Sequence, residues 1–463
     1  MRFGLLNGGI DLSAIAEYCG GMLYRGYAND RRASGISIDS RKTEPGDIFF
    51  AIKGDNFDGH IFISDARNAG AVCAVTDRKP DVNIPYILVD DVRRAFGAFA
   101  GAYKSRINIK TVAVTGSVGK TTTRQYIYSV LNTKFRTQKT DGNFNNDIGL
   151  PLTLFSLSPD CETLVLEMGM SALGEISALS RIASPDIAVI TNIGNSHIEH
   201  LGSRENILKA KLEILDGMHG GTLLLNGDDT LLRAVGEIPG IKKYYFGTDD
   251  PLCDFRATNI IQEKTGMTLD VLCPDGTQIC DLHINGYGRH NVYDALAGIA
   301  CGYITGVSPD EIRIGLCSFE PVAMRQNIKK KGKLTVIEDC YNASPESMAA
   351  AVETLCGIAR GRKVAVLGDM RELGKYSPRL HYILGEKISI SGVDMLVTIG
   401  AEAEKIARGA RNGGMAEDRI MTIESADDPA FAAEKIKEIL RDGDTVLIKA
   451  SRALALERVS ELL

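Results

Sequence analysis

Residues 115–121 have the composition and order of a phosphate-binding loop. They read Thr-Gly-Ser-Val-Gly-Lys-Thr. Glycine has no Cβ atom, so Gly116 and Gly119 allow a tight turn whose N–H groups point at phosphate oxygens. Lys120 supplies a positive charge for the terminal phosphates, and Thr121 supplies a hydroxyl for Mg²⁺. The segment therefore predicts a site for a nucleoside triphosphate.

The residues on either side of this loop support the prediction. An apolar strand is expected over Thr111–Thr115 and a helix over Thr122–Leu131, whose N-terminus would face the anion. The usual pattern has glycine five residues before Gly119, where this chain has Val114, so the loop is a shortened form. An ordinary helix-opening turn is the alternative, but it would not require the preceding strand. The loop residues assigned to ATP are Thr115, Gly116, Ser117, Gly119, Lys120, Thr121 and Thr122.

The bulk composition is that of a globular protein. Of 463 residues, 44% are hydrophobic and 24% are charged, and the formal net charge is -6. An acidic chain offers no positive field for nucleic acid. No apolar run approaches the roughly 20 residues of a membrane span, and the first residues lack the apolar run of a signal peptide. Ten cysteines are scattered singly, which favours reduced thiols and a cytoplasmic location.

The length and the pattern of apolar segments predict an α/β protein of three domains. Residues 1–105 are expected to form a small mixed α/β domain. Residues 106–322 alternate strands with helices, which indicates a central ATPase-like domain with a parallel sheet. Residues 323–463 form a Rossmann-like domain without a Gly-x-Gly-x-x-Gly fingerprint, so no dinucleotide is assigned. The strands expected in the last two domains are Thr111–Thr115, Thr163–Glu167, Ile187–Thr191, Thr222–Leu225, Leu334–Ile337, Lys363–Leu367, Met395–Ile399 and Thr445–Ile448.

Several polar residues follow the ends of the strands expected in the central domain. Thr115, Glu167 and Asn192 lie there, and parallel strands place their carboxyl ends along one edge of the sheet. Glu167 is suited to holding Mg²⁺ directly or through water. The alternative is a solvated charge at a strand end. His197 lies just beyond another strand and is either a ligand or a structural histidine.

Four further residues stand at positions where they could take part in binding or catalysis. On spacing alone, Lys211 is a lysine on the surface of a helix. Asn291 either caps the following helix or reads an adenine edge. Arg325 lies at the expected hinge into the last domain and could reach a γ-phosphate when the domains close. Asp339 ends a strand and could accept hydrogen bonds from ribose hydroxyls.

Together these stretches resemble the Mur ligases, the ATP-dependent amide-forming enzymes of peptidoglycan assembly, over essentially the whole chain. Residues 115–122 resemble the short phosphate loop of that family, which accounts for the missing glycine. Two positions depart from the usual motifs, since Ser344 stands where asparagine is more usual and Ala450 where glycine is. The motifs that resemble the member adding D-alanyl-D-alanine lie at residues 167–176, 341–345 and 367–374.

The resemblance implies a nucleotide site and a metal site. Glu167 and His197, together with Thr121, would be magnesium ligands. Lys211 would be carbamylated, and its new carboxylate would hold a second Mg²⁺. The implied catalytic set is Lys120, Glu167, His197 and Lys211. The other implied ATP contacts are Asn291 at the adenine, Arg325 at the phosphates and Asp339 at the ribose.

The resemblance also implies the substrates. These are UDP-N-acetylmuramoyl-tripeptide, bound by the first domain, and D-alanyl-D-alanine, on which the last domain closes together with ATP. Ser40 and Arg41 fall in the uridine-nucleotide motif. Asn145 and Asn146 fall in the segment that meets the UDP-linked substrate. The remaining implied substrate contacts, in the last domain, are Asn342, Ser451 and Arg452. The protein is expected to act as a monomer.

The implied reaction forms an amide through an acyl phosphate. The tripeptide carboxylate attacks the γ-phosphoryl group of ATP, and the amine of the dipeptide then displaces phosphate. One alternative is the ligase that adds lysine or diaminopimelate, but its Asp-Asn-Pro-Arg-type motif is not found. Another is a folylpolyglutamate synthase, which would lack the motif at residues 39–41. A nucleotide-gated switch or motor would hydrolyse ATP without an amine acceptor, and gives no reason for Glu167, His197 and Lys211 to converge.

Overall fold

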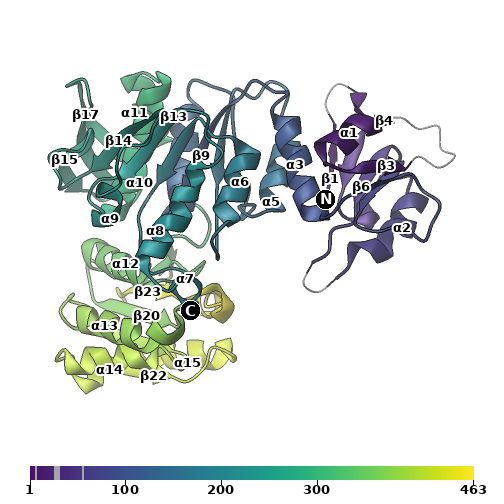
Figure 1. Ribbon diagram of the computed structural model, residues 1–463. Helices are drawn as coiled ribbons and strands as arrows, with labels where there is room; N and C mark the ends of the chain where they lie inside the picture. The colour runs from purple at the N-terminus through teal and green to yellow at the C-terminus, as the bar shows by residue number, and fades with distance from the viewer. Residues whose placement is uncertain (6–7, 25–31, 55–56) are drawn as a thin grey trace.

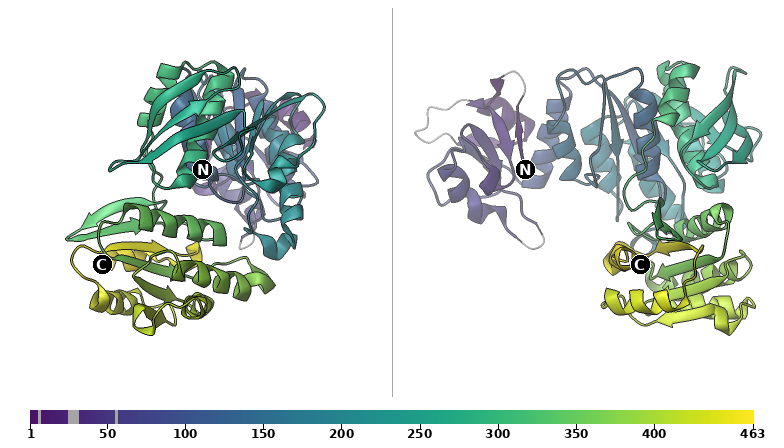
Figure 2. Two further views of the ribbon diagram at one scale, coloured as in Figure 1. Left: turned by 90° about the vertical axis from the view of Figure 1, so that its left-hand side faces the viewer. Right: turned by 180° about the vertical axis from the view of Figure 1, so that it is seen from behind.

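Sheets of six, nine and six strands define an N-terminal, a central and a C-terminal unit. The computed structural model describes residues 1–463 except 6–7, 25–31 and 55–56. The outer two units contact different sides of the central unit, which gives the chain an angular outline (Figure 1). The view from behind shows the same arrangement (Figure 2). Among the helices described, none combines the length and apolar character needed to cross a membrane.

The N-terminal unit combines helices and strands, as expected, and its sheet contains both parallel and antiparallel pairs. Its strands in sheet order are β1 (Arg2–Gly4), β5 (Gly35–Ser37), β6 (Asp47–Phe50), β7 (Cys73–Thr76), β8 (Tyr86–Leu88) and β3 (Met22–Tyr24), and the unit also contains the pair β2 (Ile10–Asp11) and β4 (Arg32–Ala33) and the helices α1 (Leu12–Tyr18) and α2 (Ile63–Asn68). The strands β5 to β8 run parallel. The edge strands β1 and β3 pair antiparallel with their neighbours.

Helix α3 (Val92–Lys104) joins the N-terminal unit to the central unit. Phe96 and Phe99 pack on Phe50 of the first sheet, with ring centroids 5.0 and 6.1 Å apart. The same two rings pack on Phe155 of the central unit at 5.3 and 5.2 Å. All four rings are buried. The two units therefore share one apolar core.

The central sheet carries the phosphate loop. Its strands in sheet order are β10 (Thr137–Lys139), β11 (Thr163–Glu167), β9 (Lys110–Thr115), β12 (Ile187–Ile190), β13 (Gly221–Asn226), β14 (Ile241–Gly247), β15 (Phe255–Gln262), β16 (Met267–Leu272) and β17 (Gln278–Ile284). The strands from β10 to β15 are parallel, as the alternation predicts. The strands β16 and β17 extend the sheet antiparallel, because the short connections between them leave no room for a crossover helix.

Helices cover both faces of the central sheet. One face carries α4 (Lys120–Leu131), α10 (Arg289–Thr305) and α11 (Pro309–Cys317), and the other carries α5 (Gly149–Phe155), α6 (Glu175–Ala183) and α8 (Arg204–Leu212); the short helices are α7 (Ile198–Leu201) and α9 (Thr230–Arg233). Alternate residues of β9 serve the two faces. Val112 and Val114 share a core with α4 and α10, whereas Ala113 belongs to the core of α5 and α6. A parallel sheet buried on both faces requires this apolar run.

The C-terminal unit is Rossmann-like, as expected. Its strands in sheet order are β18 (Asn327–Lys331), β19 (Leu334–Glu338), β23 (Thr445–Lys449), β20 (Lys363–Gly368), β21 (Met395–Ile399) and β22 (Ile420–Ile423), and its helices are α12 (Pro345–Ile358), α13 (Ser377–Ser389), α14 (Glu404–Asn412), α15 (Pro429–Ile439) and α16 (Glu457–Leu462). Only β18 pairs antiparallel among these strands. The sequence did not predict β18, because Asn-Ile-Lys-Lys-Lys is a polar edge strand with no apolar pattern.

Candidate active site

A cavity of about 1140 Å³ lies where the central and C-terminal units meet. It opens at the carboxyl ends of β9 and β11, where ligands of parallel sheets gather. Most of the residues predicted to bind nucleotide or metal line it, together with three of the predicted substrate residues. The predicted residues in its lining are Ser117, Gly119, Lys120, Thr121, Thr122, Asn145, Asn146, Glu167, His197, Asn291, Arg325, Asp339 and Asn342.

The phosphate loop is held in shape by residues at the end of β12. The carbonyl oxygen of Val118 accepts hydrogen bonds from Thr191 Oγ1 at 2.5 Å and from Asn192 Nδ2 at 2.9 Å. Gly116 has a φ of 150°, and a Cβ atom there would lie 1.9 Å from Thr191 Oγ1. This close approach requires glycine. Helix α4 begins at Lys120, two residues earlier than expected, so its free N–H groups face the cavity.

Lys120 is folded back onto the loop. Its Nζ donates a hydrogen bond to the carbonyl oxygen of Gly116 at 2.8 Å. Burial lowers the pKa of Lys120, the Glu167 carboxylate opposes that shift and Arg325 adds to it. The ammonium group is therefore poorly solvated and its main partner is a neutral carbonyl. A phosphate oxygen would be a stronger partner, because a hydrogen bond between charged groups is about twice as strong as a neutral one.

Glu167 is a buried carboxylate with three side-chain donors around it. Its exposed fraction is 3%. Oε2 accepts hydrogen bonds from Thr121 Oγ1 at 2.8 Å and Arg124 Nη1 at 3.3 Å, and Oε1 accepts one from Asn145 Nδ2 at 2.9 Å. The alternative of a solvated charge at a strand end is therefore wrong. Sequence reasoning missed Arg124, whose position one helical turn after Lys120 was the available signal.

His197 lines the cavity and pairs with a residue of the C-terminal unit. Its Nδ1 lies 2.5 Å from Oε2 of Glu372, in the loop that follows β20. The neighbouring His197 ring lowers the pKa of Glu372, and the positive charge of Lys120 contributes. Both residues of the pair have left-handed backbones, each with a φ of 62°. Glu372 falls within the motif at residues 367–374, but no residue pattern indicated its contact with His197, because this contact depends on how two units meet.

Lys211 is buried rather than on the surface of α8. Its exposed fraction is 1%. Burial holds the pKa of Lys211 well below its usual value, and the charge of Lys120 lowers it further. In the described part of the chain no hydrogen bond or ion pair to its Nζ is found. The expectation of a surface lysine is therefore wrong, and the amine is biased towards its neutral form.

Asn291 does not cap helix α10. The helix begins at Arg289 and its N-cap is Gly288, so Asn291 lies inside the first turn. Its Nδ2 donates hydrogen bonds to the carbonyl oxygen of Tyr287 at 2.8 Å and to Oε1 of Gln326 at 2.9 Å. The capping alternative is wrong. An amide at this edge of the cavity remains a predicted contact for a base.

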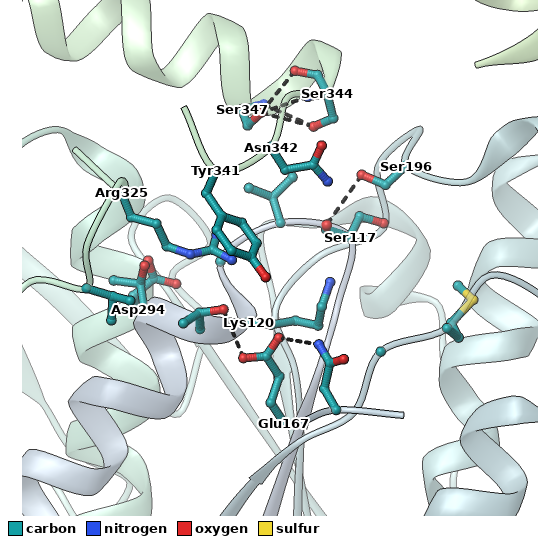
Figure 3. Close-up of a pocket in the computed structure, with 18 of the residues that line it drawn as sticks. Ser117, Lys120, Glu167, Ser196, Asp294, Arg325, Tyr341, Asn342, Ser344 and Ser347 are labelled. Carbon is teal, nitrogen blue, oxygen red and sulfur yellow. Dashed lines mark hydrogen bonds between the residues drawn. The ribbon is translucent and has the colours of Figure 1, made fainter. Parts of the chain in front are cut away.

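Arg325 stands at the connection into the C-terminal unit. Its guanidinium lies 4.2 Å from the centre of the Tyr341 ring, and its neighbours Met324 and Gln326 have φ values of 59° and 49°. Figure 3 shows Arg325 and Tyr341 on the side of the cavity opposite Glu167, with Lys120 between them. A cation stacked in this way keeps its charge close to the phosphate loop.

The carboxylate of Asp339 is held at the edge of the cavity. Its Oδ2 accepts a hydrogen bond from Lys449 Nζ at 2.7 Å. Lys449 also donates to the carbonyl oxygen of Asn342 at 3.0 Å. The lysine therefore fixes two predicted binding residues relative to each other.

Ser40 and Arg41 lie in the N-terminal unit, outside this cavity. Arg41 is exposed and its Nε is 2.9 Å from Oδ1 of Asp39. The hydrogen bond from Arg41 lowers the pKa of Asp39 to about 2. The structure does not bring this motif together with the phosphate loop.

Two predicted residues of the C-terminal unit also lie away from the cavity lining. Ser451 is buried, and its Oγ accepts a hydrogen bond from the backbone N–H of Arg371 at 2.9 Å. Arg452 is exposed and pairs with Glu457 at 2.6 Å. Other predicted residues that do not line the cavity are Thr115, Gly116 and Lys211.

Asp294 is a site residue that the sequence did not reveal. It lies on α10, lines the cavity, and accepts a hydrogen bond from Thr123 Oγ1 at 2.6 Å. A Cβ atom on Gly119 would lie 2.7 Å from its Oδ1, so the carboxyl group lies directly against the phosphate loop. Burial raises the pKa of Asp294 to about 7, against opposing effects of Thr123 and Arg325. The available signal was its place one turn after Asn291 on the same helix.

Further contacts dock the C-terminal unit on the segment between β12 and α8. Glu346, in the first turn of α12, accepts hydrogen bonds from the backbone N–H of Asn195 at 3.0 Å and from its Nδ2 at 2.5 Å. Tyr376 donates a hydrogen bond from its hydroxyl to the carbonyl oxygen of Gly202 at 2.8 Å. The same segment touches the phosphate loop, because Gly194 N–H donates to Ser117 Oγ at 2.9 Å. The segment on which the C-terminal unit docks therefore also contacts the phosphate loop.

Comparison with known proteins agrees with this geometry. The Mur ligase family catalytic domain matches residues 32–115, the Mur ligase middle domain matches residues 114–302, and the Mur ligase glutamate ligase domain matches residues 324–452. A UDP-N-acetylmuramoyl-tripeptide–D-alanyl-D-alanine ligase of Bacillus subtilis is 40% identical over 453 residues, which covers 96% of each chain.

Solved structures show the same likeness. MurF from Acinetobacter baumannii superposes with a TM-score of 0.88 at 30% identity and covers 98% of each chain. MurF ligase from Thermotoga maritima in complex with ADP superposes with a TM-score of 0.82 at 32% identity, covering 92% of this chain and 96% of that one. The likeness therefore extends over all three units.

Proposed function

This chain belongs to the Mur ligase family, and we propose that it joins D-alanyl-D-alanine to the terminal carboxylate of UDP-N-acetylmuramoyl-tripeptide with consumption of ATP. The observation that carries the proposal is the shared cavity, in which the phosphate loop and Glu167 of the central unit face Arg325 and Tyr341 of the C-terminal side. The full-length relatives that carry this activity in their names support it. The lysine- or diaminopimelate-adding ligase and the folylpolyglutamate synthase remain weaker alternatives.

The first chemical step activates the tripeptide carboxylate. A carboxylate oxygen attacks the γ-phosphorus of ATP, the bond to the ADP oxygen breaks, and an acyl phosphate forms. Lys120 and the N-terminus of α4 face the phosphates, and Arg325 can add its charge from the opposite side. The N-terminus of α4 and Arg325 are in place before the substrate arrives, whereas Lys120 exchanges the Gly116 carbonyl for a phosphate oxygen.

The second step forms the amide. The amine nitrogen of the dipeptide attacks the acyl carbon, the bond to phosphate breaks, and the nitrogen gives up a proton. Water would compete with the amine for the acyl phosphate. The C-terminal unit, docked through Glu346 and Tyr376, covers the cavity and limits that competition.

The residues at the phosphate loop fit Mg²⁺. The Thr121 hydroxyl and the Glu167 carboxylate converge within hydrogen-bonding distance, at 2.8 Å, and both offer the oxygen ligands that Mg²⁺ prefers. Across the described residues no group of three or more acidic, histidine or cysteine side chains gathers as a metal site. Thr121 and Glu167 would therefore hold the ion together with phosphate oxygens, with His197 nearby. When bound, Mg²⁺ neutralises charge on the transferring phosphoryl group.

The surroundings of Lys211 fit a carbamate. Carbamylation needs a neutral amine, whose nitrogen bonds to the carbon of CO₂ and gives up a proton. Burial and the charge of Lys120 favour the neutral amine. Conversion to a carbamate would replace a buried neutral amine, which the charge of Lys120 disfavours as a cation, by an anion that this charge favours. That anion would be the ligand for a second Mg²⁺.

Each unit takes a part in this scheme. We assign residues 1–105 to the UDP-linked substrate, 106–322 to ATP and catalysis, and 323–463 to closure on ATP and the dipeptide. The cavity supports this division, since Arg93 and Arg94 of α3 line the end that faces the N-terminal unit. Ten free cysteines and a nucleotide-linked substrate favour a cytoplasmic location. We take the enzyme to act as a monomer.

Product analysis tests the proposal. The purified protein is incubated with ATP, D-alanyl-D-alanine and UDP-linked tripeptides that differ in their third residue. The expected result is a UDP-linked pentapeptide with ADP and phosphate, formed only when both peptide substrates are present. ATP hydrolysis that is indifferent to the amine acceptor would instead indicate a switch or motor.

A further inference from the structure

Glu372 is a carboxylate near the reaction centre that the scheme above does not use. It lies in the loop after β20, on the unit that closes over the cavity, and its side chain is about half exposed at 48%. One oxygen, Oε2, pairs with His197. Within the residues that the structure describes, no hydrogen bond to its other oxygen, Oε1, is found. The group is therefore held at one end and free at the other.

The backbone at this contact is unusual on both sides. His197 and Glu372 each have a φ of 62° without being glycine. Such conformations are strained and persist where the surrounding structure fixes them, often at functional sites. The backbone N–H of Glu199 also donates to the carbonyl oxygen of Glu372 at 3.3 Å. Two strained residues are thus held facing each other across the junction of two units.

The second chemical step needs a partner for the acceptor amine. At neutral pH the free amine of D-alanyl-D-alanine is an ammonium group, which a carboxylate binds best. Glu372 pairs with His197, which lines the cavity, and the carboxylates of Glu167 and Glu372 both oppose the lowering of the Lys120 pKa. Glu167 already accepts hydrogen bonds from three side chains. Only Oε2 of Glu372 pairs with His197, so its Oε1 can accept a further hydrogen bond.

We propose that Glu372 binds the ammonium group of the dipeptide acceptor and places its nitrogen beside the acyl phosphate. One proton leaves the ammonium group for solvent before the nitrogen attacks, and a second leaves the nitrogen as the amide forms and phosphate departs. The inference rests on the proposed function and names the acceptor contact on the C-terminal unit. His197 holds Oε2, which leaves Oε1 for the ammonium group. Because Glu372 belongs to one unit and His197 to the other, the acceptor site is complete only when the units are docked.

The test compares Glu372→Gln with the wild-type enzyme in steady-state kinetics. Glutamine keeps the size and an acceptor oxygen but loses the negative charge. The KM for D-alanyl-D-alanine should rise about tenfold to a hundredfold, as expected for loss of a charged hydrogen bond. The KM values for ATP and for the UDP-linked tripeptide should stay within about twofold. ADP binding and the thermal midpoint serve as folding checks.

Glu346→Gln is the matched control. Glu346 also reaches across the junction from the C-terminal unit and, like Glu372, is not among the residues that line the cavity, but it contacts Asn195 rather than His197. This variant should not raise the KM for the dipeptide selectively. If Glu372 had a purely structural role, Glu372→Gln would behave like Glu346→Gln, with no selective change in the KM for the dipeptide.

Hydroxylamine separates the two chemical steps. It is largely uncharged at neutral pH and captures the acyl phosphate as a hydroxamate, so Glu372→Gln should form hydroxamate as fast as the wild type. A dipeptide KM unchanged in Glu372→Gln, or a parallel loss of hydroxamate, would overturn the role of Glu372. If the wild type itself gives neither pentapeptide nor hydroxamate, the proposed function fails first.

Discussion

Thr121 Oγ1 lies 2.8 Å from Glu167 Oε2 and ties the first turn of α4 to the end of β11. The two residues are 46 positions apart in the chain. Their hydrogen bond brings the hydroxyl and the carboxylate that we assign to Mg²⁺ into one place. Neighbouring parallel strands therefore bring together the two groups that we propose as metal ligands, and the segment of the glycine-rich loop supplies one of them.

Replacement of Glu167 by glutamine should disable the enzyme while preserving its fold. The amide keeps the shape of the side chain but removes the charge that would hold the metal. We expect kcat/KM to fall about 10²–10³-fold, the range for loss of one electrostatic contact at a transition state. Steady-state kinetics over a Mg²⁺ titration measure this, with exposed Glu237→Gln as the control. Wild-type kinetics in Glu167→Gln would contradict the assignment.

Lys211→Ala should lose most activity if Lys211 is carbamylated. Added bicarbonate cannot modify alanine, but a small carboxylate can occupy the space left by the side chain and restore part of the activity. The modification itself is read independently of activity, by ¹³C NMR of the wild type in labelled bicarbonate. A fully active Lys211→Ala variant together with an unmodified lysine in the wild type would exclude the carbamate.

Asp294→Asn should change how stability depends on pH. The pKa of Asp294 is raised from 3.8 to about 7 in the folded chain, so between these values the folded state binds a proton that the unfolded state has lost. The wild type therefore loses stability as pH rises through this window, and asparagine does not titrate. Relative to the wild type, Asp294→Asn should gain on the order of 2 kcal/mol between pH 5 and 7.

Urea or thermal unfolding of both proteins at pH 5, 6, 7 and 8 measures this difference. Asparagine keeps an oxygen that can accept the hydrogen bond from Thr123. A constant difference across the pH range would show that Asp294 titrates normally.

Gly116→Ala should impair nucleotide binding. The new methyl group would lie 1.9 Å from Thr191 Oγ1. The same hydroxyl donates a hydrogen bond to the carbonyl oxygen of Val118 in the loop. Overpacking of this kind costs about 1–3 kcal/mol. We expect the affinity for ADP to fall about tenfold or more, as measured by calorimetry. Gly236→Ala is the control, because nothing lies within 4 Å of its added methyl group; equal affinities in the two variants would contradict the prediction.

The sequence predicted well whatever depends on local pattern. The loop at 115–121, the apolar strand before it and the position of Glu167 at a strand end all follow from neighbouring residues and from the rule for parallel sheets. The three-unit α/β organisation also follows from the order of apolar segments. These features need no knowledge of how distant segments meet.

The predictions that were wrong or missing share one physical cause, which is tertiary packing. Lys211 has the spacing of a surface lysine, but its helix packs against the sheet with that residue inside. Asn291 has the composition of a helix cap, yet Gly288 can adopt the backbone angle that starts the helix two residues earlier. The pairing of His197 with Glu372 spans two units. No local pattern encodes such a contact.

Arg325 sits between two non-glycine residues that both have left-handed backbones, Met324 and Gln326. A left-handed conformation costs a non-glycine residue about 1–2 kcal/mol. The backbone that connects the central and C-terminal units is therefore strained at two positions. If the contacts of Glu346 and Tyr376 were lost and the units separated, we expect the two strained residues to relax and Arg325 to move away from the phosphate loop.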